Sequence, residues 1–166
     1  MSIELVKAYL QPYGVANRAQ EFSVSSATVE LAAQALGVEP ARIAKTISLK
    51  SEDGCILVVA AGDAKIDNVK FKAEFHTKAK MLSADEVPPL TGHPVGGVCP
   101  FANPESAKVY CDVSLQRFHT IFPACGSANS AIELSCGELF DCSHSVRWVD
   151  VCKNWQTEGT PHADAQ

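Results

Sequence analysis

The sequence predicts a single α/β domain of the α+β type, with one mixed, largely antiparallel sheet flanked by short helices. The chain has 166 residues, 46% of them apolar and 20% charged, which is typical of one domain with its own core. Segments with the period of a strand outnumber those with the period of a helix, and hairpin connections dominate. The expected domain covers residues 1–152, followed by a polar C-terminal tail at 153–166.

The first predicted elements are two short helices. Ile3, Val6 and Leu10 recur at helical spacing, and Pro12 cannot continue the helix. A second helix follows residues 25–26. Its apolar and small side chains recur on one face up to Leu36, before a glycine that is typical of a helix C-terminus.

The pattern then changes to the period of a strand. Residues 43–50 alternate, a turn follows at 51–54, and residues 55–61 are apolar throughout, so we expect a hairpin whose second strand is buried on both faces. Lys45 falls on the same face as Ile43, Ile47 and Leu49, which should face the core. A lysine there must extend to water, pair with a carboxylate or serve a pocket.

The second half alternates short helices with strands. Asp67 is expected to begin a helix that runs to Phe75. Ser83 and Glu86 have the spacing of a capping box that opens a further helix, which should end at Pro88-Pro89. Strands are predicted at 108–113, 120–123, 131–135 and 146–151, and a helix at 136–142.

Composition excludes several classes of protein. No apolar run approaches the roughly 20 residues of a membrane span, and the first residues do not have the pattern of a signal peptide. Seven cysteines without a C-x-x-C pair argue against a disulfide framework, so we expect a cytoplasmic protein. The net charge of −5 argues against a generally basic nucleic-acid surface, although the 64–80 segment has five lysines against two acidic residues.

The 92–101 loop is the second candidate functional feature. It contains three glycines and two prolines in ten residues, so its main-chain N–H groups can approach a ligand closely. It is not a P-loop, because no Gly-Lys-Ser/Thr follows, and it is not a dinucleotide fingerprint, because it opens no helix. A plain surface loop is the alternative at this point.

The sequence contains no recognisable catalytic triad or G-x-S-x-G elbow. Cys99 lies six residues after His93, so a thiol nucleophile with a histidine base is one hypothesis. The spacing of Cys136, Cys142 and His144 matches no standard zinc pattern, and we predict no metal site.

Three segments resemble the YbaK / prolyl-tRNA-synthetase-associated domain family. They are Ala44-Lys45-Thr46-Ile47, the glycine loop Gly92…Gly96-Gly97-Val98-Cys99-Pro100-Phe101, and Gly126…Ile132-Glu133-Leu134. The resemblance runs from about Ser25 to Leu134 and covers most of the chain.

The resemblance implies a YbaK-like fold and a free-standing trans-editing hydrolase that removes a wrong amino acid from tRNA, with tRNA-Pro carrying a small amino acid as the suggested substrate. It implies no cofactor, metal or protein nucleophile. Lys45 would bind the charged 3′ end of the tRNA, and the N–H groups of the loop would hold the carbonyl group while water attacks. The implied catalytic residues are Lys45, Gly96 and Gly97. The implied substrate-binding residues are Thr46, Gly92, His93, Val98, Pro100, Phe101, Gly126, Ser127 and Asn129.

The implied partners are the aminoacylated acceptor end of a tRNA and, beyond it, an aminoacyl-tRNA synthetase, with no membrane. The cysteine-specific branch of the family has a serine and an aspartate where this chain has Ala124 and Ala131, and an aromatic residue near Thr28. Cysteine specificity is therefore not carried over, because editing pockets separate amino acids by size and single hydrogen bonds. The alternative function is a non-catalytic module of the same fold that binds an amino acid, a nucleotide or an RNA end.

Overall fold

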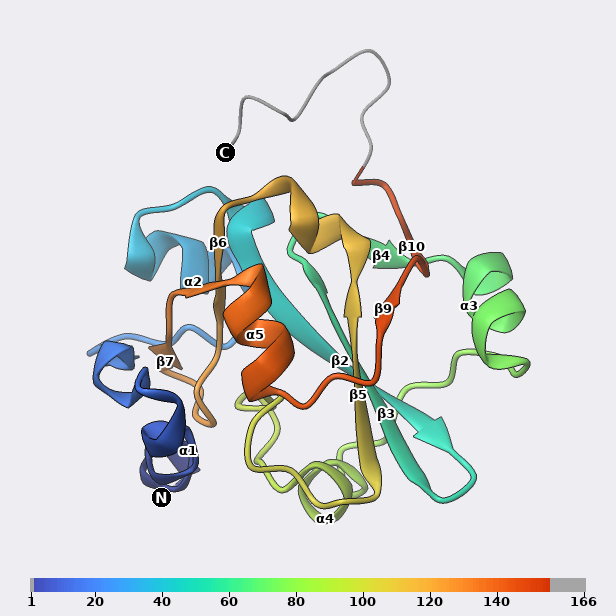
Figure 1. Ribbon diagram of the computed structural model, residues 1–166, viewed down its shortest axis with the longest axis horizontal. Coiled ribbons are helices and arrows are strands. Elements are labelled where there is room, and N and C mark those ends of the chain that lie inside the picture. Colours follow the sequence, from blue (N-terminus) through green and yellow to red (C-terminus); the bar gives the residue numbers. More distant parts are fainter. Residues whose placement is uncertain (1, 156–166) are drawn as a thin grey trace.

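A computed structural model describes residues 2–155 as a mixed sheet surrounded by short helices (Figure 1). The six-stranded sheet has the order β8-β6-β2-β3-β5-β9. Its strands are β2 (Ile43–Ser51), β3 (Gly54–Ala61), β5 (Ala107–Asp112), β6 (Thr120–Pro123), β8 (Leu134–Ser135) and β9 (Trp148–Val149). Two small antiparallel pairs join β1 (Gln20–Glu21) to β7 (Ser130–Ala131) and β4 (Lys65–Ile66) to β10 (Cys152–Lys153).

Figure 1 places the central strands across the middle of the molecule, with α2 on the left, α3 on the right and α4 below. The α-helices of the described chain are α1 (Ser2–Leu10), α2 (Val29–Leu36), α3 (Asn68–Phe75), α4 (Val87–Thr91) and α5 (Cys136–Cys142). Short 3₁₀ turns occupy Gln11–Tyr13, Ala16–Arg18, Pro40–Arg42 and Val113–Arg117. The helices around residues 3–10, 29–36, 67–75 and 136–142 are confirmed, and Asp67 caps α3 by accepting from two backbone N–H groups.

The predicted hairpin is confirmed and forms the centre of the fold. β2 pairs antiparallel with β3 from Ala44↔Ala61 to Ser51↔Gly54, across a two-residue turn. Residues 55–61 are all buried, as expected for a strand covered on both faces. In this register Lys45 lies opposite Ala60, one residue beyond the stretch of β2 that β6 pairs.

The mixed α/β class is confirmed, but the sheet has more parallel pairing than the prediction allowed. β6 with β2, β3 with β5, and β5 with β9 are parallel, whereas β2 with β3 and β6 with β8 are antiparallel. The long connection from β3 to β5 contains α3 and α4. Such a crossover returns the chain in the same direction, which a tight hairpin cannot do.

Three predicted boundaries are corrected. The 131–135 strand is interrupted, because β7 pairs with β1 whereas β8 pairs with β6. The 146–151 strand is reduced to β9, since the Val151 N–H donates to the Asp112 side chain instead of a strand. Pro88-Pro89 lies in the first turn of α4 and does not end the helix, because a proline lacks only an N–H that the first turn leaves unpaired.

The C-terminal prediction also changes. Lys153 belongs to β10 and the Trp155 side chain is only 8% exposed, so the ordered chain continues past the predicted boundary at residue 152. Residues 156–166 of the predicted tail lie outside the described residues.

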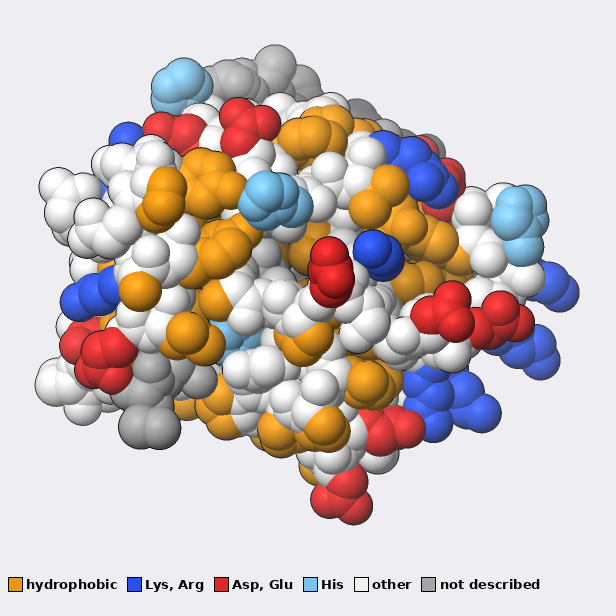
Figure 2. Space-filling view, turned by 60° about the horizontal axis from the view of Figure 1, so that its bottom comes forward, with side chains coloured by type: hydrophobic (Ala, Val, Ile, Leu, Met, Phe, Trp, Pro, Cys, Tyr) orange, Lys and Arg blue, Asp and Glu red, His pale blue; other side chains and the backbone are white. Residues whose placement is uncertain are grey.

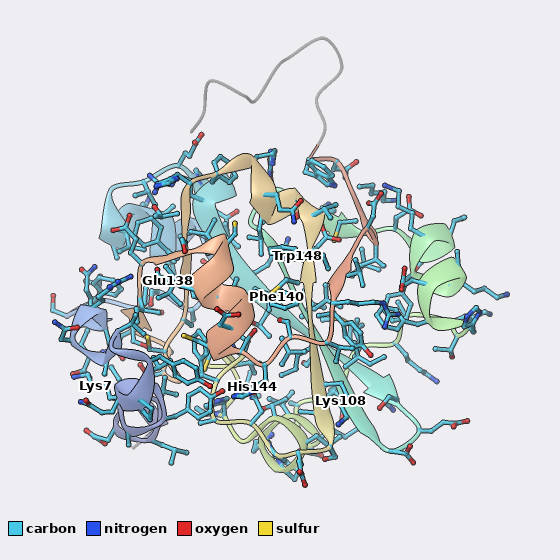
Figure 3. The ribbon with its side chains drawn as sticks, in the orientation of Figure 1. Lys7, Lys108, Glu138, Phe140, His144 and Trp148 are labelled. Atoms are coloured by element: carbon cyan, nitrogen blue, oxygen red, sulfur yellow. The ribbon has the colours of Figure 1, made fainter. Side chains whose placement is uncertain are left out.

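The α5 helix packs against the C-terminal strand region. The rings of Phe140 and Trp148, both labelled in Figure 3, stack with their centroids 5.6 Å apart. Glu138, at the start of α5, accepts both guanidinium N–H groups of Arg18 at 2.8 and 3.0 Å and completes a capping box with Ser135. These contacts join α5 to β9 and to the 3₁₀ turn at Ala16–Arg18.

Candidate functional site

A small cavity lies where the parallel strands β2 and β6 separate. The two strands pair only at Ile43↔Phe122 and Ala44↔Pro123. Beyond these pairs the edge of β2 is open, and the cavity of about 230 Å³ occupies the space between this edge, α2 and the glycine loop. Its lining residues are Ser26, Ala27, Thr28, Val29, Ala32, Ile43, Ala44, Lys45, Thr46, Gly96, Val98, Phe122, Ala124, Ser130 and Ala131.

Lys45 is the cationic side chain among the residues that line this cavity. Its Nζ donates to the carbonyl oxygens of Gly62, at 3.3 Å, and of Ala64. Burial lowers the pKa of Lys45 from its ordinary value. Because an ammonium has three N–H donors, one remains for a ligand in the cavity.

Thr46 supplies an unpaired hydroxyl beside Lys45. Its Oγ1 is buried and has no hydrogen-bond partner among the described residues. A buried hydroxyl without a partner costs free energy unless a ligand or water satisfies it, so this oxygen is a candidate contact for a bound molecule. The hydroxyls of Thr28 and Ser130 already have backbone partners, because Thr28 caps α2 and Ser130 bonds to the Cys125 N–H.

The glycine loop contributes main-chain donors at Gly96 and Val98. Neither of their N–H groups has an acceptor within residues 2–155, and both residues line the cavity. The Gly97 N–H is different, because it donates to the Pro94 carbonyl at 2.9 Å. In this structure the Gly97 N–H is therefore already paired, and the donor role that the resemblance implies for it stays a prediction. The available donors are on Gly96 and Val98.

Gly126, Ser127 and Asn129 support the loop and do not line the cavity. A Cβ on Gly97 would lie 2.9 Å from the Ser127 Cα and 3.0 Å from the Gly126 carbonyl oxygen, so the two backbones are in close contact. Ser127 donates to the Asn129 side chain at 2.9 Å, and Asn129 donates to the Phe22 carbonyl at 2.9 Å. In this structure the three residues pack against the loop, and their substrate-binding role stays a prediction.

His93, Gly92, Pro100 and Phe101 also lie away from the cavity lining. His93 is 1% exposed, and its Nε2 lies 2.7 Å from the Phe101 carbonyl oxygen. Burial lowers the pKa of His93. Gly92, at φ +82°, ends α4 by donating to the Pro88 carbonyl. These residues form the base of the loop, so their predicted contact with substrate is not supported.

The proposed thiol nucleophile is buried too. The Cys99 Sγ lies 3.4 Å from the His93 Nε2, but Cys99 is fully buried and does not line the cavity. Burial raises the pKa of the Cys99 thiol far above its ordinary value. A thiol without access to solvent and held protonated cannot attack a substrate.

For the deacylation that the family resemblance implies, we expect Cys99→Ala to stay near the wild-type rate, because a buried, protonated thiol is not required. The measurement is the initial rate at equal concentrations of folded protein. A matched Cys125→Ala variant, which removes another buried thiol, controls for the loss of packing. Complete inactivation of Cys99→Ala alone would restore the thiol hypothesis.

Several lining residues were not singled out from the sequence. Ala27, Val29 and Ala32, at and before α2, form one wall, and Ile43 and Phe122 form another. The sequence feature that could have identified these residues is the small side chains of the second helix, which allow that helix to lie close to β2. Their position over Lys45 depends on how α2 packs, which helical spacing alone does not determine.

A wider hollow of about 1620 Å³ lies at the hairpin tip and is lined largely by charged side chains such as Lys50, Glu52 and Lys108. We place the candidate site in the smaller cavity, because it combines an unpaired hydroxyl, two available N–H donors and a partly buried ammonium. Over residues 2–155, no three His, Cys, Asp or Glu side chains are grouped as a metal site would need. No helix in that range is long and apolar enough to cross a membrane.

Comparisons with known proteins agree on one family. The family model of the aminoacyl-tRNA editing domain matches residues 24–142 of this chain. The chain is 54% identical over 157 residues to the uncharacterised protein YwhH of Bacillus subtilis (strain 168), covering 94% of this chain and 100% of that protein. It is 27% identical over 138 residues to an Enterococcus faecalis protein named as a candidate Cys-tRNA(Pro)/Cys-tRNA(Cys) deacylase, covering 81% and 82% of the two chains.

Solved structures give the same answer for the fold. A candidate trans-editing enzyme for prolyl-tRNA synthetase superposes with a TM-score of 0.83 at 25% identity, covering 92% of this chain and 97% of that one. The family match includes Lys45, Thr46, Gly96 and Val98, which line the cavity. The chain therefore belongs to the aminoacyl-tRNA editing domain family.

Proposed function

We propose that this protein is a free-standing trans-editing hydrolase that cleaves the ester bond of a misacylated tRNA, with tRNA-Pro carrying a wrong small amino acid as its substrate. The observation that carries the proposal is the cavity whose lining includes Lys45, Thr46 with its unpaired hydroxyl, and Gly96 and Val98 with their available N–H groups. It has the donors that an ester carbonyl and a nearby phosphate require. The site of action is expected to be the cytoplasm.

The attacking group is proposed to be water. No thiol, carboxylate or imidazole belongs to the lining residues, so the hydroxyls that line the cavity have no such group beside them to activate them as nucleophiles. Water attacks the carbonyl carbon of the ester, and the bond between that carbon and the ribose oxygen breaks. The ribose oxygen takes one proton of the water and leaves as a hydroxyl, the other proton goes to solvent, and the amino acid is released as a carboxylate. The substrate's own hydroxyl or amino group can orient the water. No metal takes part in this scheme, and chelator is expected to leave the rate unchanged.

The loop N–H groups and Lys45 have separate roles in this scheme. Gly96 and Val98 stabilise the developing oxyanion, for which each well-placed donor is worth roughly 3 kcal/mol. The remaining N–H of Lys45 binds a phosphate of the tRNA 3′ end, which a charge-assisted hydrogen bond favours. The amino acid occupies the apolar part of the cavity, between α2 and Ala124.

The size of the cavity supports an amino acid as the bound group. Its volume of about 230 Å³ is below the roughly 300–1,000 Å³ of pockets for drug-sized ligands. Apart from Lys45, no charged side chain lines it. A cationic amino-acid side chain would therefore be buried beside Lys45 without a partner, and an anionic one would compete with the phosphate for Lys45, so small uncharged side chains are favoured.

The lysines of the 64–80 segment are proposed to contact the tRNA backbone outside the cavity. Figure 2 shows basic side chains gathered on the right, the side on which Figure 1 places α3, with acidic side chains beside them. Some are paired, since Lys70 lies 3.0 Å from Asp150. A few phosphate contacts are enough for a domain that holds only the acceptor end.

The test is deacylation of tRNAs charged with Ala, Ser, Cys or Pro by catalytic amounts of the protein. We expect repeated turnover of at least one mismatched pair, and correctly charged Pro-tRNA-Pro to persist. A folded protein that binds charged tRNA without turnover would support the alternative, a binding module. The apolar Ala124 and Ala131 walls of the cavity give that alternative its support, because they offer no hydrogen bond to a water.

A further inference from the structure

The Lys45 ammonium is held by a single turn of the chain. Both of its carbonyl partners, Gly62 and Ala64, lie in the turn that follows β3, and the Ala64 N–H closes the turn on the Ala61 carbonyl at 2.9 Å. Ala64 is completely buried. The position of the ammonium at the cavity wall therefore depends on where this turn sits.

Asp63, between the two carbonyls, joins the turn to Arg117. The Asp63 carboxylate accepts from both terminal nitrogens of the guanidinium, at 2.6 and 3.0 Å. The Arg117 side chain is 7% exposed and that of Asp63 is 34% exposed, so the pair is partly shielded from water. A bidentate pair of this kind fixes direction as well as distance.

Arg117 is itself fixed from several sides. It donates to the carbonyls of Ser114, at 2.9 Å, and Trp155, at 3.0 Å. Its guanidinium carbon lies 4.8 Å from the Phe118 ring centroid and 5.2 Å from that of Trp155. Trp155 lies beyond residues 24–142, the range of the family match. The C-terminal segment thus takes part in placing the turn.

We propose that Asp63 and Arg117 are positioning residues for Lys45: their ion pair holds the 62–64 turn, whose two carbonyls orient the ammonium at the cavity. The inference rests on the proposed function. Neither residue lines the cavity, so they act on the substrate only through Lys45.

The charges around Lys45 predict the direction in which the pKa of Lys45 changes when Asp63 is replaced. Burial has the largest effect and lowers the pKa of Lys45, and Lys65 acts in the same direction. Cys152, Asp63 and Glu30 act in the opposite direction. Removing the Asp63 charge therefore lowers the pKa of Lys45 further. If protonated Lys45 is required, activity is lost at a lower pH on the alkaline side.

The experiment compares the full-length wild type with Asp63→Asn, Asp63→Glu and a control, Asp53→Asn, in the exposed hairpin turn. We measure kcat and KM from pH 6 to 9.5, after subtracting spontaneous ester hydrolysis, and the titration of the Lys45 side chain by ¹³C NMR. For Asp63→Asn we expect kcat/KM to fall about 10- to 100-fold, as for a displaced binding group. The alkaline limb of its kcat/KM–pH profile and the Lys45 titration should both move to lower pH. Asp63→Glu should recover part of the lost kcat/KM.

The outcomes separate this inference from the proposed function. An inactive wild type would overturn both. An active wild type whose Asp63→Asn variant keeps kcat/KM, its alkaline limb and the Lys45 titration would overturn the positioning role alone. If Asp63→Asn only loses stability, so that its Tm falls while its Lys45 titration and pH profile stay unchanged, the positioning role would also be overturned. If Asp63→Asn does not fold, Arg117→Lys tests the geometric part alone, because it keeps both charges but loses the bidentate geometry. Its kcat/KM should fall while the Lys45 titration stays near that of the wild type, and an unchanged kcat/KM in the folded variant would overturn the positioning role.

Discussion

Lys45→Met is expected to lower kcat/KM for deacylation by about 100-fold or more, because it removes the charged donor at the cavity. Methionine is unbranched and of similar length, so it preserves the packing of the lysine stem. The Gly62 and Ala64 carbonyls lose a donor, which should reduce the free energy of unfolding by about 1–3 kcal/mol. The measurements are initial rates on the preferred tRNA and urea denaturation.

Lys50→Met is the matched control. Lys50 lies on the same strand at the hairpin end, is exposed, and forms an ion pair with Glu86 at 3.4 Å between exposed side chains. Such surface pairs contribute about 1 kcal/mol or less, so rate and stability should both stay near wild type. A folded Lys45→Met variant with full activity would remove Lys45 from the mechanism.

The hairpin and Lys45 could be predicted because their signals are local. An alternating segment, a two-residue turn and a continuous apolar run specify β2 and β3 and bury residues 55–61. The same alternation identified Lys45 as an exception on an apolar face. The parallel pairing of β3 with β5 could not be found in this way, since α3 and α4 separate the two strands in the sequence.

The glycine loop shows why spacing alone does not define a site. Gly96 and Val98 reach the cavity, whereas Gly97, between them, donates to Pro94 and packs on the 126–127 backbone. His93 looked available as an acid or base, but it turns inward and lies 2.7 Å from the Phe101 carbonyl oxygen. Which groups face a ligand depends on backbone directions within the loop, and these are not visible in residue types.

The comparison with the cysteine-specific branch of the family pointed to cavity residues that the quoted motifs do not include. Thr28, Ala124 and Ala131 were noted because they differ from the cysteine-specific branch, and all three line the cavity. Thr28 comes from the approach to α2, far in the sequence from Ala124, which follows β6, and from Ala131 in β7. Differences at three contacting positions change one pocket, which supports a change of amino-acid preference over a change of reaction.

Gly97→Ala is expected to reduce kcat/KM by about 100-fold, although Gly97 itself donates nothing to the substrate. The new Cβ would lie 2.9 Å from the Ser127 Cα and 3.0 Å from the Gly126 oxygen and the Ser127 nitrogen. These are backbone atoms, so the loop must move, and the N–H groups of Gly96 and Val98 move with it. A displacement of about 1 Å in a positioning element can cost about 100-fold in rate.

Gly137→Ala separates this effect from the general effect of replacing glycine. Gly137 lies in α5, and the nearest atom to its added Cβ is the Ser135 Oγ at 4.0 Å. Alanine should stabilise the helix there by about 0.5–1 kcal/mol and leave kcat/KM unchanged. The variants are compared by steady-state kinetics. Binding of uncharged tRNA is a second readout that should stay constant, because the proposed scheme assigns the ester to the loop and the phosphate to Lys45. Normal turnover by Gly97→Ala would contradict a role for the loop donors, since a displaced loop could not hold the oxyanion.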